Sequence, residues 1–98
     1  MVNEKTTDNK EILAIYDVIA HLRDTLIGKN KDYGSSAFER PYLHPHLPVV
    51  DAILVRMSDK VNRLHNIMQN NAVCDETIDD TVLDLAGYCI LFLANRKS

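Results

Sequence analysis

The sequence contains few of the residues that give small proteins a covalent framework or special backbone geometry. Its 98 residues include no tryptophan, two cysteines, three glycines and three prolines. Two cysteines, Cys74 and Cys89, are too few for a disulfide framework, and their spacing is unlike that of a metal-binding motif. Cys89 lies within an apolar run, which predicts a buried free thiol. A free thiol suits a reducing compartment, so we expect a cytoplasmic protein.

Long apolar runs and an excess of positive charge are also missing. No apolar run approaches the roughly 18 residues that are needed to cross a bilayer, and the polar start MVNEKTTDNKE lacks the apolar core of a signal peptide. We therefore expect no contact with a membrane. The formal net charge of −3 argues against direct nucleic-acid binding, because phosphate backbones favour a basic surface.

The pattern that is present is helical. Apolar residues recur at intervals of three and four, which predicts helices over 8–29, from near 48 to about 70, and from between 75 and 77 to about 95. No strand pattern or internal repeat interrupts them. The sequence thus predicts one all-α domain over 1–98, with three long helices in an antiparallel bundle.

The connections complete this outline. Residues 1–7 are expected to be flexible, and 30–48 form a long first loop that contains Gly34 and all three prolines. A loop of this length in a small domain is usually functional or disordered. A chain this short buries only a modest core, and the uncharged stretch 85–94 predicts a third helix that is buried on most sides. We therefore expect oligomerisation to complete the bundle.

Two carboxylates mark the third predicted helix. Asp80 and Asp84 are four residues apart and project from one face of the predicted helix. Further along the helix, the same face becomes apolar. Carboxylates beside a core need a cation, a metal or strong donors, and Mg²⁺ prefers oxygen ligands. The alternative is helix-end electrostatics, because acids near a helix N-terminus favour its dipole. That alternative explains Asp80 better than Asp84, which lies about a turn deeper.

The second predicted helix carries a cluster of charges. Arg56, Asp59 and Arg63 are spaced by three and four residues on one face, and Lys60 is adjacent. Taken alone, this spacing favours an exposed row of intrahelical ion pairs, each worth a few tenths of a kcal/mol. The functional alternative places Asp59 with the acids of the third helix, while the cations bind phosphate.

The stretch KNKDYGSSAF, residues 29–38, allows two interpretations. Lys29 and Lys31 can neutralise phosphate charge, Gly34 permits close approach of the backbone, and Tyr33 can stack on a base or donate a hydrogen bond. Alternatively, the lysines complement the C-terminal dipole of the first helix, and a tight turn follows. The residues themselves do not decide between these alternatives.

Three motifs in order resemble one protein family. KNKDYG, RMSDKVNRL (56–64) and DETIDDTVLDLAGY (75–88) are similar to motifs of the MazG-like all-α nucleoside triphosphate pyrophosphohydrolases. The likeness is greatest to their nucleotide-modification-associated domains, which are common in phage and mobile elements. It covers about residues 10–95.

The resemblance implies an enzyme whose substrate is a nucleoside triphosphate. Such a hydrolase cleaves between the α- and β-phosphates and releases a monophosphate and pyrophosphate. The resemblance also implies Mg²⁺, with Mn²⁺ as a substitute, held by carboxylates of two helices, and assembly as a homodimer or homotetramer. The alternatives are a non-catalytic helical module that binds a nucleotide or a protein, and a structural dimerisation domain without a ligand.

The resemblance carries roles to individual residues. It implies catalytic carboxylates at Asp59, Asp80 and Asp84, and metal ligands at these three positions and at Glu76. Together with the charge pattern, it implies substrate-binding residues Lys29, Lys31, Tyr33, Arg56, Lys60 and Arg63. One departure from the family pattern is Asn62, which stands where the wider superfamily has a second carboxylate on the earlier helix.

Overall fold

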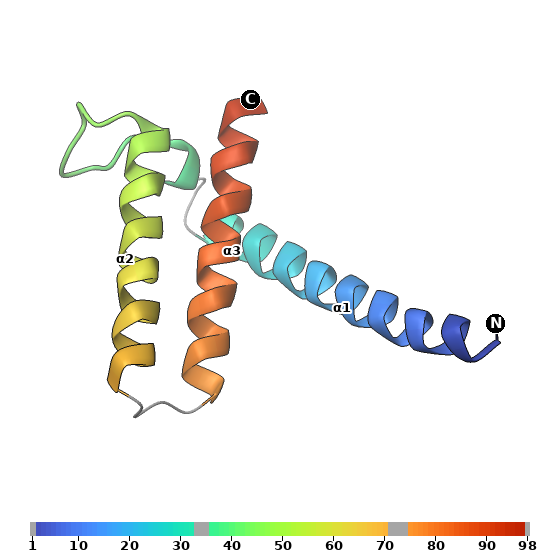
Figure 1. The fold of residues 1–98 in the computed structure, drawn as a ribbon. Coiled ribbons are helices and arrows are strands. Elements are labelled where there is room, and N and C mark those ends of the chain that lie inside the picture. Colours follow the sequence, from blue (N-terminus) through green and yellow to red (C-terminus); the bar gives the residue numbers. More distant parts are fainter. Residues whose placement is uncertain (1, 33–35, 71–74, 98) are drawn as a thin grey trace.

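The fold is all-α in the computed structural model, which describes residues 2–32, 36–70 and 75–97. Its elements are α1 (Val2–Asp32), the short 3-10 helix η1 (Ser36–Phe38), α2 (Val49–Asn70) and α3 (Asp75–Lys97). No strand occurs in these ranges, which confirms the predicted fold class (Figure 1). None of the helices so described has a segment that is both long and apolar enough to cross a bilayer.

The predicted limits of the second and third helices are confirmed, but those of the first are wrong at both ends. α2 begins directly after Pro48, which suits the start of a helix. α1 begins at Val2 instead of Asp8 and continues past Gly28. Apart from the adjacent residues and backbone of its own helix, no described heavy atom would lie within 4 Å of a Cβ at Gly28, and glycine inside an exposed helix costs only about 1 kcal/mol. The lysines of the last turn favour the helix dipole there.

The centre of the fold is the pair formed by α2 and α3. The two helices lie side by side and run in opposite directions (Figure 1), as predicted for an antiparallel bundle. Ile53 on α2 and Thr81 on α3 are buried. Near the end of α3, the Asn95 side chain donates a hydrogen bond of 3.1 Å from Nδ2 to the carbonyl oxygen of Ala37. This bond fixes η1, and with it the start of the long loop, against α3.

Helix α1 meets this pair only near its own C-terminal end. It crosses α3 there and projects away from the other two helices (Figure 1). At the crossing, a Cβ on Gly87 would lie 3.3 Å from Leu26 Cδ2 and 3.8 Å from Leu22 Cδ1. The absence of a side chain at Gly87 therefore lets α1 approach α3 closely.

The rest of the apolar stripe on α1 has no partner within the described chain. Ile12, Ile15, Tyr16 and Ile19 lie N-terminal to the crossing on the same stripe, and all are exposed. The accessible surface of 7917 Å² exceeds the roughly 5,700 Å² expected for a compact monomer of this mass. The radius of gyration of 16.7 Å likewise exceeds the roughly 12.6 Å expected for 98 residues. The single chain is thus open on the side of α1.

The helix crossing generates the first prediction. Gly87→Leu should lower the free energy of unfolding by about 1–3 kcal/mol, because the new side chain overlaps the leucines of α1. Gly87→Ala should change it by less than about 1 kcal/mol, since flexible leucine ends can shift and alanine favours a helix. Urea unfolding measures both values.

The matched control is Gly28→Leu, at a helical glycine that faces open space. It should raise the free energy of unfolding by up to about 1 kcal/mol through helix propensity alone. Equal stability of the two leucine variants would show that the crossing at Gly87 is not tightly packed.

Candidate functional site

A cleft of ≈ 980 Å³ lies where α1, the long loop, α2 and α3 meet. Its lining comes from the C-terminal half of α1, from the segment 36–42 without Phe38, from the first half of α2 and from α3. The crossing at Gly87 and the hydrogen bond from Asn95 therefore hold two of its walls in place. The ionisable residues of its lining are His21, Lys29, Glu39, Arg40, Tyr42, Arg56, Asp80, Asp84 and Tyr88.

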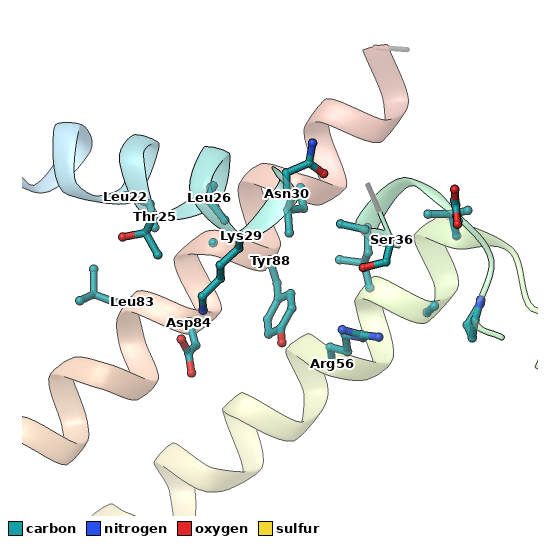
Figure 2. Close-up of a pocket in the computed structure, with 18 of the residues that line it drawn as sticks. Leu22, Thr25, Leu26, Lys29, Asn30, Ser36, Arg56, Leu83, Asp84 and Tyr88 are labelled. Carbon is teal, nitrogen blue, oxygen red and sulfur yellow. The ribbon is translucent and has the colours of Figure 1, made fainter. Parts of the chain in front are cut away.

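One wall is a polar row on α3. Asp80, Asp84 and Tyr88 are four residues apart and line the cleft together, because residues at this spacing share a helix face. In Figure 2, Asp84 and Tyr88 project from α3 into the cleft, and the Tyr88 ring lies between Lys29 and Arg56. The structure thus brings together the two acids that the sequence singled out and adds a phenol to them.

Cations reach the cleft from three different elements. Lys29 comes from α1, Arg40 from the loop and Arg56 from α2, and Figure 2 shows the Lys29 side chain extending toward Asp84. They balance the acids of the lining, which are Glu39, Asp80 and Asp84. Because the whole chain carries a net charge of −3, this neutral cleft is more favourable to an anion than the average surface.

Lys60 forms an ion pair with Asp84 across the α2–α3 seam. The distance from Lys60 Nζ to Asp84 Oδ2 is 3.1 Å, and the two side chains are 23% and 43% exposed. Lys60 is not part of the cleft lining but compensates a carboxylate that is. The pair accounts for a charged Asp84 beside the core, which helix-end electrostatics explains poorly.

Several residues proposed from the sequence lie elsewhere. Lys31, Asp59 and Arg63 are exposed and do not belong to the lining. Within the described ranges, Asp59 forms no ion pair, so the expected row with its neighbouring arginines is not formed there. Tyr33 lies outside the described residues, as does the side chain of Glu76.

The structure also adds residues that the sequence did not assign to a site. From the sequence, Tyr88 is expected in the core or an interface with its hydroxyl near the acids, but it is not assigned to the site; the structure places it in the lining with Asp80 and Asp84. Arg40 and Tyr42 enter from the loop, where no periodicity indicates which side chains face the cleft. Only the path of the loop, which Asn95 helps to fix, brings them to the site.

The family resemblance implies a bound Mg²⁺, so the carboxylates of the cleft are the groups that would have to hold it. In the described part of the chain, no three His, Cys, Asp or Glu side chains are grouped so that they could hold an ion. Asp80 and Asp84 remain as two carboxylates on one wall of the cleft. Mg²⁺ typically takes one or two protein carboxylates and completes its shell with water and substrate phosphate. The two acids therefore fit a Mg²⁺ ion that arrives with a phosphate ligand.

Fold and site together define a small all-α domain with a mixed-charge cleft built on a helical hairpin. Residues 29–95 match the family described as nucleotide modification associated domain 1, and the chain belongs to that family. The match begins at Lys29 and ends at Asn95, so it includes all the cleft elements except most of α1. Comparison with curated proteins and with solved structures gives no match.

The ion pair generates the second prediction. Lys60→Met should lower the free energy of unfolding by less than about 1 kcal/mol, because both partners are partly exposed and water screens their attraction. A double-mutant cycle with Asp84→Asn, measured by urea unfolding at low and high salt, isolates the pair from other effects.

The coupling energy should be favourable at low salt and smaller at 1 M salt, where screening is strong. A coupling of zero at low salt would mean that Lys60 does not compensate Asp84 in solution.

Proposed function

We propose that the chain is a Mg²⁺-dependent nucleoside triphosphate pyrophosphohydrolase of the MazG-like kind. The reaction breaks one P–O bond of the bridge between the α- and β-phosphates. The phosphorus that loses the bridge gains the oxygen of water, and the bridging oxygen leaves with the other product, which gives a monophosphate and pyrophosphate. The observation that carries the proposal is the cleft itself. Two carboxylates one helical turn apart face cations from three other segments, in a chain of a nucleotide-modification-associated family.

Three side chains of the cleft, which are Lys29, Arg56 and Tyr88, would bind the polyphosphate of the nucleotide. Lys29 and Arg56 neutralise the oxygens of the polyphosphate, and the arginine can donate two hydrogen bonds to one phosphate group. Tyr88 lies between them in Figure 2 and offers a hydroxyl donor. Held in this way, the phosphates approach Asp80 and Asp84 with their charge partly compensated.

The two acids would hold the metal ion. Bound Mg²⁺ neutralises charge on phosphate oxygens and helps to orient the phosphates for in-line attack. Lys60 must then share Asp84 with the ion or release it. The ion pair of 3.1 Å keeps Asp84 compensated when no nucleotide is bound. Asp59 and Glu76 remain ligands that only the resemblance implies.

A second candidate is a nucleotide-binding module without catalysis. Two observations favour it: Lys60 already neutralises one of the two acids, and Asn62 replaces a carboxylate of the superfamily pattern. Such a module would bind the same ligand through Lys29, Arg56 and Tyr88.

The activity generates the third prediction. With Mg²⁺, the wild type should release pyrophosphate from at least one member of a panel of ribo- and deoxyribonucleoside triphosphates. Asp84→Asn should lower kcat at least 100-fold, because the ion loses a ligand at the reacting phosphates. Asp51→Asn is the matched control, since Asp51 is exposed on α2 and does not line the cleft, and it should keep the wild-type rate.

Two results would count against catalysis in different ways. Nucleotide binding by calorimetry without any pyrophosphate release would support the binding module. Turnover that survives Asp84→Asn would place the reaction at other residues. Asp59→Asn, measured in the same assay, tests the role that the resemblance implies for that acid.

We further propose that the protein is a homo-oligomer whose contact includes the exposed stripe of α1. This stripe consists of Ile12, Ile15, Tyr16 and Ile19. The surface exceeds that of a compact monomer by about 2,200 Å², which is more than the roughly 800 Å² that each partner contributes to a standard interface. A second copy presents the same apolar stripe, so the contact is self-complementary.

Oligomerisation generates the fourth prediction. Ile15, at 59% exposure, lies in the middle of the stripe, and Ile15→Glu should convert the oligomer to a monomer because the contact would bury a charge. Lys10→Glu is the matched control, since Lys10 lies on the opposite face of α1. Sedimentation velocity distinguishes the species. A wild-type chain that sediments as a monomer at 100 μM would contradict the proposed contact.

A further inference from the structure

Tyr42 occupies an unusual position among the loop residues of the cleft. It belongs to the cleft lining, yet its side chain is 96% exposed, so the ring has almost no contact with the rest of the chain. An apolar ring left in water forgoes the stabilisation that burial would give. At a cleft, however, this exposure leaves both faces of the ring accessible to a bound ligand.

The loop around Tyr42 is braced by specific contacts. The backbone N–H of His44 donates to the carbonyl of Pro41 at 3.1 Å, and that of Leu47 donates to the carbonyl of His44 at 3.0 Å. The Arg40 guanidinium donates from Nη1 to the carbonyl of Pro45 at 3.2 Å. Pro45 is the second residue of the later turn, where its fixed φ limits the alternatives of the chain. The loop therefore presents the ring from a defined backbone.

The chemistry of the rest of the cleft indicates what this ring meets. Lys29 enters the lining from α1, the two acids from α3, Arg56 from α2 and Tyr42 from the loop, so the cleft combines charged groups with one exposed aromatic ring. A nucleotide combines the matching parts, which are a charged polyphosphate and a flat base joined by a sugar. Aromatic side chains stack on bases of every kind, because every base has a π-face.

We propose that Tyr42 is the residue on which the base of a bound nucleotide stacks. This inference rests on the proposed nucleotide-binding function and adds the recognition of the nucleoside part. Stacking distinguishes a nucleotide from inorganic polyphosphate, but it selects weakly among bases. Purines bind more tightly than pyrimidines, since they overlap the ring more extensively.

The test compares two ligands in the presence of Mg²⁺: an α,β-imido deoxyadenosine triphosphate, which resists cleavage at the α–β bond, and inorganic tripolyphosphate. Tyr42→Ala should weaken binding of the nucleotide about tenfold and leave binding of tripolyphosphate unchanged. Tyr42→Phe keeps the ring and should bind as the wild type does. Leu43→Ala is the matched control, because Leu43 is 92% exposed in the same loop but does not line the cleft.

A spectroscopic readout separates stacking from a structural effect. The base protons of the bound nucleotide should shift upfield in the wild type and in Tyr42→Phe, owing to the ring current, and the shift should be absent with Tyr42→Ala. Unchanged nucleotide affinity in Tyr42→Ala would overturn the proposal. An equal loss of affinity for tripolyphosphate would do the same, because it would show a role in shaping the cleft or in binding phosphate.

The experiments can refute the stacking role of Tyr42 and the proposed catalysis independently of each other. A selective loss of nucleotide binding in Tyr42→Ala supports the stacking role even if the wild type releases no pyrophosphate. Turnover by the wild type together with unaltered binding by Tyr42→Ala keeps the enzyme and removes the stacking role. A wild type that binds tripolyphosphate but no nucleotide overturns both.

Discussion

The contact between α1 and α3 at Gly87 is the constraint on which the site depends. Leu22 and Leu26 rest on a position without a side chain, and this close approach carries Lys29 to the wall that holds Asp80 and Asp84. The rest of α1 contributes little to the packing of the single chain. The cleft is therefore held by van der Waals contact between helices and by the hydrogen bond from Asn95 to the loop.

The site also depends on compensation of the negative charge of the α3 carboxylates. Asp80 is exposed, but Asp84 is only partly exposed, so its charge has the greater need of a partner. Lys60 meets this requirement for Asp84 from the neighbouring helix. A divalent ion bound with a polyphosphate would meet it in the proposed functional state. In the proposed function, the carboxylate that pairs with Lys60 across the helical hairpin would also hold the ion.

Much of the fold could be predicted from the sequence because its signals are local. The periodicity and Pro48 place α2 and α3 correctly, and the spacing of Asp80 and Asp84 puts them on one face. Gly28 misled the prediction for α1, because a single glycine does not end a helix without a competing turn. The departure of α1 from the hairpin could not be predicted, since an apolar stripe shows that a helix packs but not what it packs against.

The candidate site divides in the same way. Lys29, Arg56 and the two acids of α3 were identified from the sequence and meet at one cleft. Asp59 was expected with them, but it lies on an exposed part of α2, because the direction in which a helix face points depends on its neighbours. Tyr42 and Arg40 were not identified, since a loop places side chains through specific turns and bonds and not through a repeating pattern.

The most direct test of this account is a map of backbone amide chemical shifts during titration with the α,β-imido deoxyadenosine triphosphate and Mg²⁺. If the nucleotide occupies the cleft, the largest changes should fall at Lys29, at Tyr42, around Arg56 and along α3 from Asp80 to Tyr88. The far end of the hairpin, around Leu64 and Met68 of α2, should be unaffected. Changes concentrated there or along the exposed stripe of α1, with none at Asp84 and Tyr88, would contradict the claim that this cleft is the nucleotide site.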